Sequence, residues 1–96
     1  MTSLELNKLI HEPSRLKIIV QLYAVERTDF LYLKRQLGLT WGNLSVHLSK
    51  LEKAGYIEIK KSIVNKKTHT SVRLTSSGRI TFEEYRKSLK RVLGET

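Results

Sequence analysis

Apolar residues recur along most of this chain at intervals of three or four positions, and over one stretch they alternate with polar residues instead. The first spacing is typical of helices that pack by one face, and alternation is typical of strands. The pattern predicts a short opening helix over 3–10, a second helix that begins at Pro13, and further helices over 30–37 and 41–54. Pro13 suits the first position of a helix, because a backbone N–H would have no partner there.

The two middle helices have clear signals at their ends. Asp29 can cap the first of them, and Gly38 can end it in the left-handed conformation. Thr40 can cap the second, so only a short turn separates the two helices. This is the spacing of a helix-turn-helix, which we assign to residues 28–55.

Extended segments follow. Ile57 and Ile59 share one face of a first strand, and Val72 and Leu74 share one face of a second strand. The tip of the resulting hairpin is expected at Asn65-Lys66-Lys67, because asparagine tolerates a positive φ. The hairpin therefore covers residues 56–74.

A last helix is expected from a cap at Thr75 or Ser76 to about Leu93. The predicted order is thus four helices, two strands and a helix, a mainly α chain with a small β-hairpin (α+β). A length of 96 residues fits one domain with one small core, over 1–96.

Composition narrows the class of protein. The chain has no cysteine, which excludes disulfides and thiolate metal sites. No apolar run approaches the roughly 18 residues that span a bilayer, so we expect no membrane partner and a cytoplasmic location. The formal net charge is +9, and residues 31–81 hold ten basic and two acidic side chains, which is +8. Such a field attracts a polyanion, although charge alone fits a solvated surface equally well.

The second helix of a helix-turn-helix lies in the major groove of DNA. If Leu44, Leu48 and Leu51 anchor this helix to the core, its opposite face is free to contact bases and phosphates. Asparagine can pair with adenine, lysine with guanine or phosphate, and valine can touch a thymine methyl group. Trp41 either packs against the preceding helix or lies against sugar and phosphate. The candidate DNA-binding residues here are Thr40, Trp41, Gly42, Asn43, Ser45, Val46, Ser49 and Lys50.

The hairpin that follows is basic. A basic hairpin beside a recognition helix can lie along the flanking backbone or enter the minor groove, and it would be the wing of a winged helix-turn-helix. The alternative is a solvated hairpin. The candidate wing contacts are Lys60, Lys61, Asn65, Lys66, Lys67, Thr68 and Arg73.

Two motifs carry a family resemblance. The segment Gly42 to Ile57, GNLSVHLSKLEKAGYI, and the segment Leu74 to Arg79, LTSSGR, resemble the winged-helix transcriptional regulators of the arsenic-repressor (ArsR) and multiple-antibiotic-resistance (MarR) groups, in particular short archaeal-type members. The resemblance covers residues 9–89 and implies a homodimer that binds operator DNA. The second motif lacks the proline and the acid of the common LTPEGR form but keeps the cap.

The two ends of the chain carry more apolar residues than one small core needs. We expect residues 1–12 and 76–96 to build a twofold interface that sets two recognition helices one turn of DNA apart. The alternative is packing within one chain alone. The candidate interface residues are Leu4, Leu6, Leu9, Phe82, Tyr85, Leu89 and Val92.

The sequence gives little support for metal binding or catalysis. His11, His47 and His69 fall on three different elements, which argues against a metal site, and no catalytic triad or phosphate-binding loop occurs. We expect no enzyme activity, no cofactor and no metal, and the residues leave any small-molecule effector open. The leading hypothesis is a sequence-specific, double-stranded DNA-binding transcriptional regulator. The alternative is a winged helix used for protein contact or general chromosome binding in a larger assembly.

Overall fold

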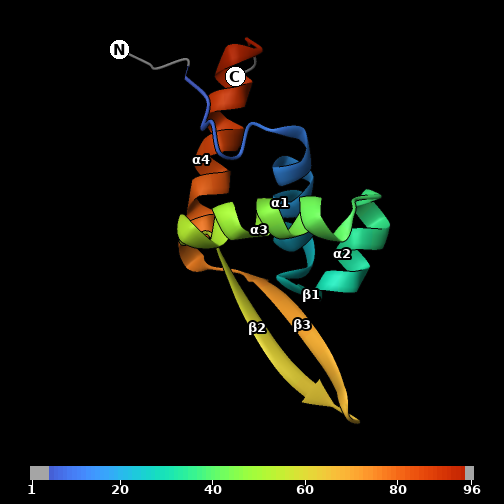
Figure 1. Ribbon diagram of the computed structural model, residues 1–96. Coiled ribbons are helices and arrows are strands. Elements are labelled where there is room, and N and C mark those ends of the chain that lie inside the picture. Colours follow the sequence, from blue (N-terminus) through green and yellow to red (C-terminus); the bar gives the residue numbers. More distant parts are fainter. Residues whose placement is uncertain (1–4, 95–96) are drawn as a thin grey trace.

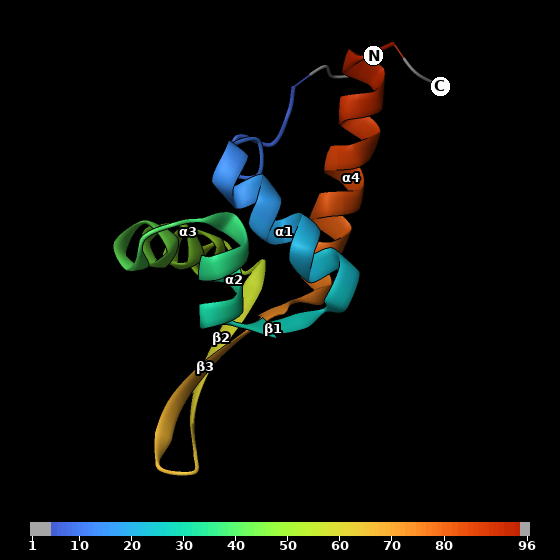
Figure 2. The ribbon, with the colours of Figure 1, turned by 90° about the vertical axis from the view of Figure 1, so that its right-hand side faces the viewer.

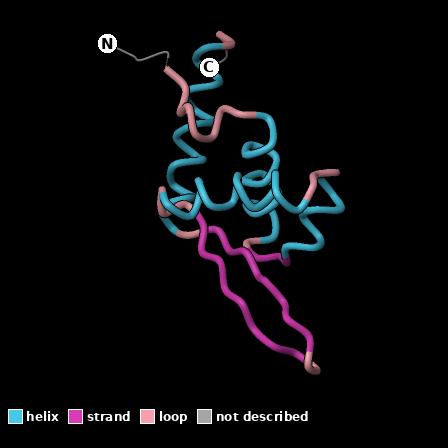
Figure 3. Tube along the Cα trace, in the orientation of Figure 1, coloured by secondary structure: helices cyan, strands magenta, loops and turns pink. Residues whose placement is uncertain are grey.

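The computed structural model describes residues 5–94 and has four helices and three strands within them (Figure 1). The helices form the body, and the hairpin of the last two strands projects from it (Figure 3). The elements in chain order are α1 (Pro13–Val25), β1 (Arg27–Asp29), α2 (Phe30–Leu37), α3 (Trp41–Lys53), β2 (Ile57–Val64), β3 (Lys67–Leu74) and α4 (Ser76–Val92).

The signals at the helix ends act as predicted. The Asp29 carboxylate accepts the backbone N–H of Tyr32 at the start of α2, and Gly38 ends this helix with φ 63°. Thr40 caps α3 by accepting the N–H of Asn43 at 3.1 Å, and Thr75 caps α4. The fold class, a winged helix of the α+β type, is therefore confirmed.

The expected opening helix is wrong over the residues that the structure describes, and positions 3 and 4 lie outside them. Residues 8–10 form turns instead. The side-chain oxygen of Asn7 accepts the N–H groups of Leu9 and Ile10, which closes a local turn. Glu12 is extended at φ −142°, as a residue before proline prefers, so no helix can continue into α1.

Strand β1 was not predicted. Its three residues pair antiparallel with Ser71, Val72 and Arg73 of β3, which gives a three-stranded sheet in the order β1-β3-β2. Three residues are too few to show an alternating pattern, so the sequence carries no period that would indicate this strand. It fixes the start of α2 against the sheet, because Asp29 both ends β1 and caps α2.

The core lies where α1, α2 and α3 meet the sheet and the first half of α4. The expected inward residues of α3 are buried, and so are Ile57, Val72 and Leu74 of the two long strands, whereas Ile59 is only partly buried. Val20 and Leu31 are exposed, because Ile18, Ile19 and Leu33 take the inward positions of α1 and α2. The buried apolar residues are Ile10, Ile18, Ile19, Leu22, Leu33, Leu44, Leu48, Leu51, Ile57, Val72, Leu74, Phe82 and Tyr85.

The joint between α3, the sheet and α4 explains both sequence motifs. The Thr75 hydroxyl donates to the carbonyl of Gly55 at 2.6 Å and accepts the N–H of Gly78 at 3.0 Å. The Tyr56 carbonyl accepts the N–H of Thr75 at 3.0 Å. Gly78 packs so closely on that carbonyl that a β-carbon there would overlap it. The AGY and LT-x-x-G segments therefore lock together the end of α3 and the start of α4.

Candidate nucleic-acid interface

Helix α3 presents a polar outer face opposite its three buried leucines. Gly42, Asn43, Val46 and Lys50 are exposed along this face. Within residues 5–94, the side chain of Asn43 has no hydrogen-bond partner and Lys50 has no ion pair. Both side chains are thus available to an external ligand.

The inner side of α3 is held in place by polar contacts to α1. The Arg15 guanidinium lies 3.2 Å from Nδ1 of His47 and also donates to the carbonyl of Leu9 at 2.6 Å. Since arginine only donates, Nδ1 of His47 accepts in this arrangement. His47 therefore helps to pack this helix, and the contact fixes α3 relative to α1.

Glu12 completes this cluster. Its carboxylate caps α1 by accepting the N–H groups of Ser14 and Arg15, and it lies 3.6 Å from Nδ1 of His47. Partial burial acts to raise the pKa of Glu12, but the backbone hydrogen bonds from Arg15 and Ser14, together with the nearby His47 and Arg15, hold this pKa below its ordinary 4.5. Glu12 is therefore a charged cap under neutral conditions.

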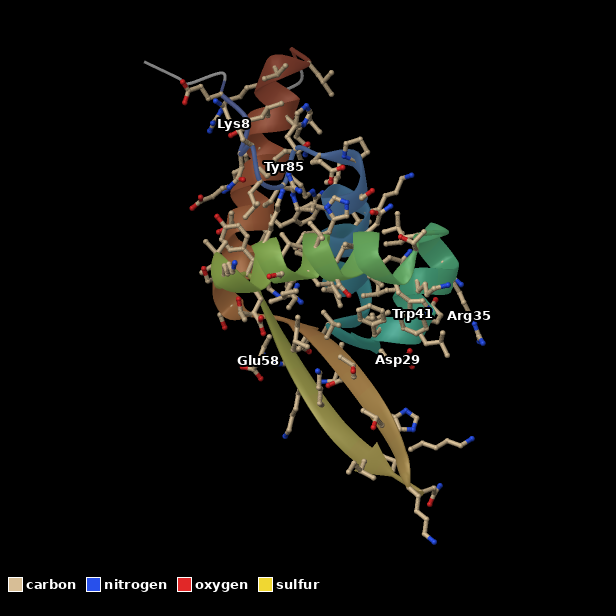
Figure 4. The ribbon with its side chains drawn as sticks, in the orientation of Figure 1. Lys8, Asp29, Arg35, Trp41, Glu58 and Tyr85 are labelled. Atoms are coloured by element: carbon tan, nitrogen blue, oxygen red, sulfur yellow. The ribbon has the colours of Figure 1, made fainter. Side chains whose placement is uncertain are left out.

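Trp41 both packs on the preceding helix and remains open to solvent. Its indole stacks on the ring of Phe30, with centroids 5.1 Å apart and planes within 9°, and the Lys34 ammonium lies 5.3 Å from the indole centroid. The side chain is nevertheless 57% exposed. Figure 4 shows it at the first turn of α3, beside α2. The stack fixes one face of the indole and leaves the rest available for a ligand.

The hairpin carries free cations along its length. Asn65 and Lys66 form its two-residue turn, both with positive φ (51° and 64°), as in a type I′ turn. The predicted tip is thus confirmed, with Lys67 as the first residue of β3. Within the described chain, the lysines at 60, 61, 66 and 67 form no ion pair. Thr68, beside the tip, is exposed.

Arg73 differs from the other cations of the predicted wing. Its guanidinium lies 3.1 Å from the carboxylate of Glu58 on the neighbouring strand, at the base of the hairpin. The charge is already paired, and the side chain faces away from the hairpin face that packs on α3. The proposed interface therefore does not include Arg73.

A hollow of about 330 Å³ lies between α3 and the hairpin. Ser45 and Ser49 line it from the helix, and Lys61 and Thr70 line it from the strands. The full lining is Phe30, Trp41, Ser45, Leu48, Ser49, Glu52, Ile59, Lys61 and Thr70. The structure thus brings predicted residues of the helix and of the wing around one concave surface.

Five of these lining residues were not predicted as site residues: Phe30, Leu48, Glu52, Ile59 and Thr70. Phe30 reaches the hollow because it stacks on Trp41, and Thr70 reaches it because it pairs with Lys61 across the hairpin. Glu52 adds an acidic side chain to a lining that is neutral apart from Lys61. The register of the hairpin is the signal that could have indicated Thr70, since residues paired across two strands share a face.

The predicted interface residues have different environments. Leu4 lies outside the described residues. Phe82 and Tyr85 are buried in the chain's own core: Phe82 packs on Tyr23 at 4.9 Å between centroids, and the Tyr85 hydroxyl lies 2.8 Å from Nδ1 of His11. Burial raises the pKa of Tyr85 above its ordinary 10.0. These two side chains are used within one chain.

The remaining interface candidates are more open. Leu6, Leu9 and Leu89 are partly buried against the core, and Val92 is 45% exposed. They lie on the N-terminal segment and on α4, which extends away from the body on the side opposite the hairpin (Figures 1 and 2).

The described chain shows neither a metal cluster nor a membrane span. Residues 5–94 contain no group of three or more His, Asp or Glu side chains placed to hold a metal ion. Among the same residues, no helix is both long and apolar enough to cross a membrane.

A helix-turn-helix followed by a hairpin that shares a concave surface with its second helix defines the winged helix-turn-helix class of DNA-binding domain. The comparison with known families agrees. The chain belongs to the winged helix DNA-binding domain family, whose model matches residues 14–93.

Individual relatives support the same assignment. An uncharacterized protein of Methanocaldococcus jannaschii is 42% identical over 78 residues, which are 81% of this chain and 85% of that protein. A transcriptional regulator homologue from Pyrococcus horikoshii OT3 superposes with a TM-score of 0.86 at 30% identity, over 92% of this chain and 87% of that one. NadR, solved in complex with 4-hydroxyphenylacetate, superposes with a TM-score of 0.73 at 25% identity, over 92% and 62%. The expected similarity to MarR-like winged-helix regulators is confirmed.

Proposed function

We propose that this protein is a sequence-specific regulator of transcription that binds double-stranded DNA as a homodimer. The observation that carries this proposal is the concave surface between α3 and the hairpin. Ser45 and Ser49 of the helix and Lys61 of the hairpin line it, and Lys61 forms no ion pair within residues 5–94. The family match and the regulators among the structural neighbours support the same function.

Helix α3 supplies the base contacts in this proposal. Asn43 pairs with an adenine edge, Val46 contacts a thymine methyl group, and Lys50 reaches a guanine or a phosphate. Ser45 and Ser49, which line the hollow, donate to the DNA strand that passes over it. The side chains that specify the DNA sequence are therefore those on the exposed face of α3.

The start of α3 and the hairpin supply the backbone contacts. Gly42 has no atom within 4 Å of the place of a β-carbon, so a phosphate can approach it closely. Thr40 and Trp41 lie beside it at the helix N-terminus, which favours an anion. Along the hairpin, contacts to the DNA backbone come from Lys60, Lys61, Asn65, Lys66, Lys67 and Thr68.

The homodimer rests on the apolar surface at the other end of the molecule. Val92 and Leu93 are exposed near the end of α4, and Leu6, Leu9 and Leu89 are only partly covered. A second copy that packs on this surface would bury it and would leave the two recognition helices free. With twofold symmetry, the two helices would enter major grooves about 34–36 Å apart.

Selection of bound duplexes from a random pool tests the proposal. The expected result is one enriched motif with two related half-sites whose centres are one helical turn apart. Substitution Asn43→Ala is then expected to relax the preference at one position of each half-site, at a cost of about 1–3 kcal/mol. Enrichment of no motif, with equal binding to all duplexes, would instead favour general chromosome binding.

A further inference from the structure

The tip of the hairpin carries two exposed apolar side chains among lysines. Ile63 is 76% exposed and Val64 is 50% exposed, and both adjoin the turn at Asn65 and Lys66. Exposed apolar residues on a projecting hairpin promote aggregation, and proteins usually avoid them there. The pair therefore calls for a ligand that buries at least one of the two side chains.

The register of the hairpin separates the two residues. Side chains alternate between the faces of a strand, so Ile63 shares a face with Ile57, Ile59 and Lys61, whereas Val64 lies on the opposite face. Ile59 and Lys61 line the hollow beneath α3. Ile63 therefore continues the face that bounds the DNA-binding surface, and Val64 faces away from it.

The reach of the hairpin matches the geometry of DNA. Ile57 is buried beneath α3, and the six residues from there to Ile63 span about 20 Å in an extended strand. Neighbouring major and minor grooves are half a helical turn, or about 17 Å, apart along the axis. With α3 in a major groove and the hairpin directed along the duplex axis, Ile63 would reach the adjacent minor groove.

The charges around the tip identify the partner as DNA. Lys61, Lys66 and Lys67 surround Ile63 in the sequence and form no ion pair within residues 5–94. A cationic rim suits the negative potential of a minor groove, and an apolar side chain at its centre suits the stacked bases beneath.

We propose that Ile63 is a wedge that enters the minor groove, partly unstacks one base step and bends the duplex. This inference rests on the proposed DNA-binding function and extends it. The wedge favours pyrimidine–purine steps such as TA or CA at that place, because these steps unstack most easily. Ile63 then contributes to specificity through deformation of the DNA, without a hydrogen bond to a base.

The substitutions Ile63→Thr and Val64→Thr form a matched pair for the test. Both keep a β-branched residue in the strand, both act on exposed side chains, and they differ in the face that they change. The probe is a duplex from the random-pool selection, labelled at its ends for energy transfer and carrying 2-aminopurine at the expected step.

The wild-type protein and Val64→Thr are expected to bend this duplex by at least about 20° and to raise the 2-aminopurine fluorescence. Ile63→Thr is expected to lose most of both signals and to bind roughly tenfold more weakly, because its apolar side chain no longer covers the bases. Equal bends for all three proteins would overturn the wedge. An unbent complex of the wild-type protein would also overturn it. The same holds if light scattering shows that Ile63→Thr changes only the self-association of the protein.

These results separate the two proposals. Specific binding to an unbent duplex removes the wedge and leaves the regulator. A wild-type protein that binds no duplex selectively removes the proposed function, and the wedge falls with it.

Discussion

Gly78 sets the approach of α4 to the sheet at the level of single atoms. A β-carbon at this position would overlap the Tyr56 carbonyl oxygen and lie 2.8 Å from Cδ1 of Leu74. The Tyr56 backbone cannot move aside without a large cost in free energy. Glycine is therefore required at position 78 by this close contact and not by its φ. The family motif indicated this glycine from the sequence, but only the structure gives its physical reason.

We expect Gly78→Ala to destabilise the fold by about 1–3 kcal/mol, because the added methyl group overpacks a buried joint. Urea unfolding followed by circular dichroism measures the change. Gly42→Ala is the matched control: it also lies in a helix, meets nothing within 4 Å and should leave stability unchanged or slightly higher. Equal effects of the two substitutions would contradict the role of Gly78.

Glu12 gives a prediction about pH. Its pKa is lowered in the folded state, so the charged cap stabilises the fold above the ordinary pKa of 4.5, and this contribution is lost as the pH falls through the folded value. Glu12→Gln is expected to cost about 0.5–1 kcal/mol at pH 7. Below the folded pKa the cost should disappear.

Unfolding curves for wild-type protein and Glu12→Gln, recorded from neutral to acidic pH, check this. A difference in stability that stays constant across the whole range would show that the charge of Glu12 is not the cause.

At the scale of elements, prediction from the sequence succeeded where local signals were strong. The bounds of α2 followed from Asp29 and Gly38, and the tip of the hairpin followed from Asn65. The prediction of an opening helix was wrong because its apolar spacing is a weak signal. The Asn7 side chain closes a turn there, and the residue before Pro13 is extended. Strand β1 was missed because its pairing with β3 is long-range and three residues carry no pattern.

The candidate site, too, was predictable from the sequence only where the signals were local. The face of α3 could be predicted from the spacing of its leucines, and the lysines of the hairpin from composition. The stack of Phe30 on Trp41 and the pairing of Arg73 with Glu58 depend on how separate elements meet, so the sequence alone could not indicate them.

The hairpin yields a prediction on salt dependence. Substituting Lys66 and Lys67 together by alanine is expected to weaken DNA binding. The slope of log affinity against log salt should fall by about 0.9 for each phosphate that is no longer neutralised, or about 3.6 for the two wings of a dimer. Lys87→Ala with Lys90→Ala, on the exposed side of α4, is the matched control for charge.

Titrations of labelled duplex at several salt concentrations measure these slopes. If the wing variant and the α4 variant change the slope equally, net charge rather than a placed contact accounts for binding.

At the scale of the whole molecule, two surfaces lie at opposite ends. The hairpin projects on one side and the far half of α4 on the other (Figure 2), so the proposed dimer contact and the proposed DNA contact would not interfere. The excess of apolar residues at the chain ends is visible in the sequence. The sequence does not show how many of these residues belong to the chain's own core. In the structure, Phe82 and Tyr85 are core residues.

We expect Val92→Glu to convert a dimer into monomers at micromolar concentration, because it places a charge in an apolar interface. Val25→Glu, at an exposed apolar residue near the end of α1, is the control and should leave the mass unchanged. Sedimentation velocity distinguishes the species. A wild-type protein that is already monomeric would contradict the proposed dimer.

One titration tests the central claim most directly. Labelled duplex carrying the selected motif is bound to the wild-type protein and displaced by unlabelled duplex, either identical or with the motif scrambled, at physiological salt. The account predicts that the scrambled duplex competes at least about 10³-fold more weakly, as is typical for specific sites. Equal competition by the two duplexes would contradict it.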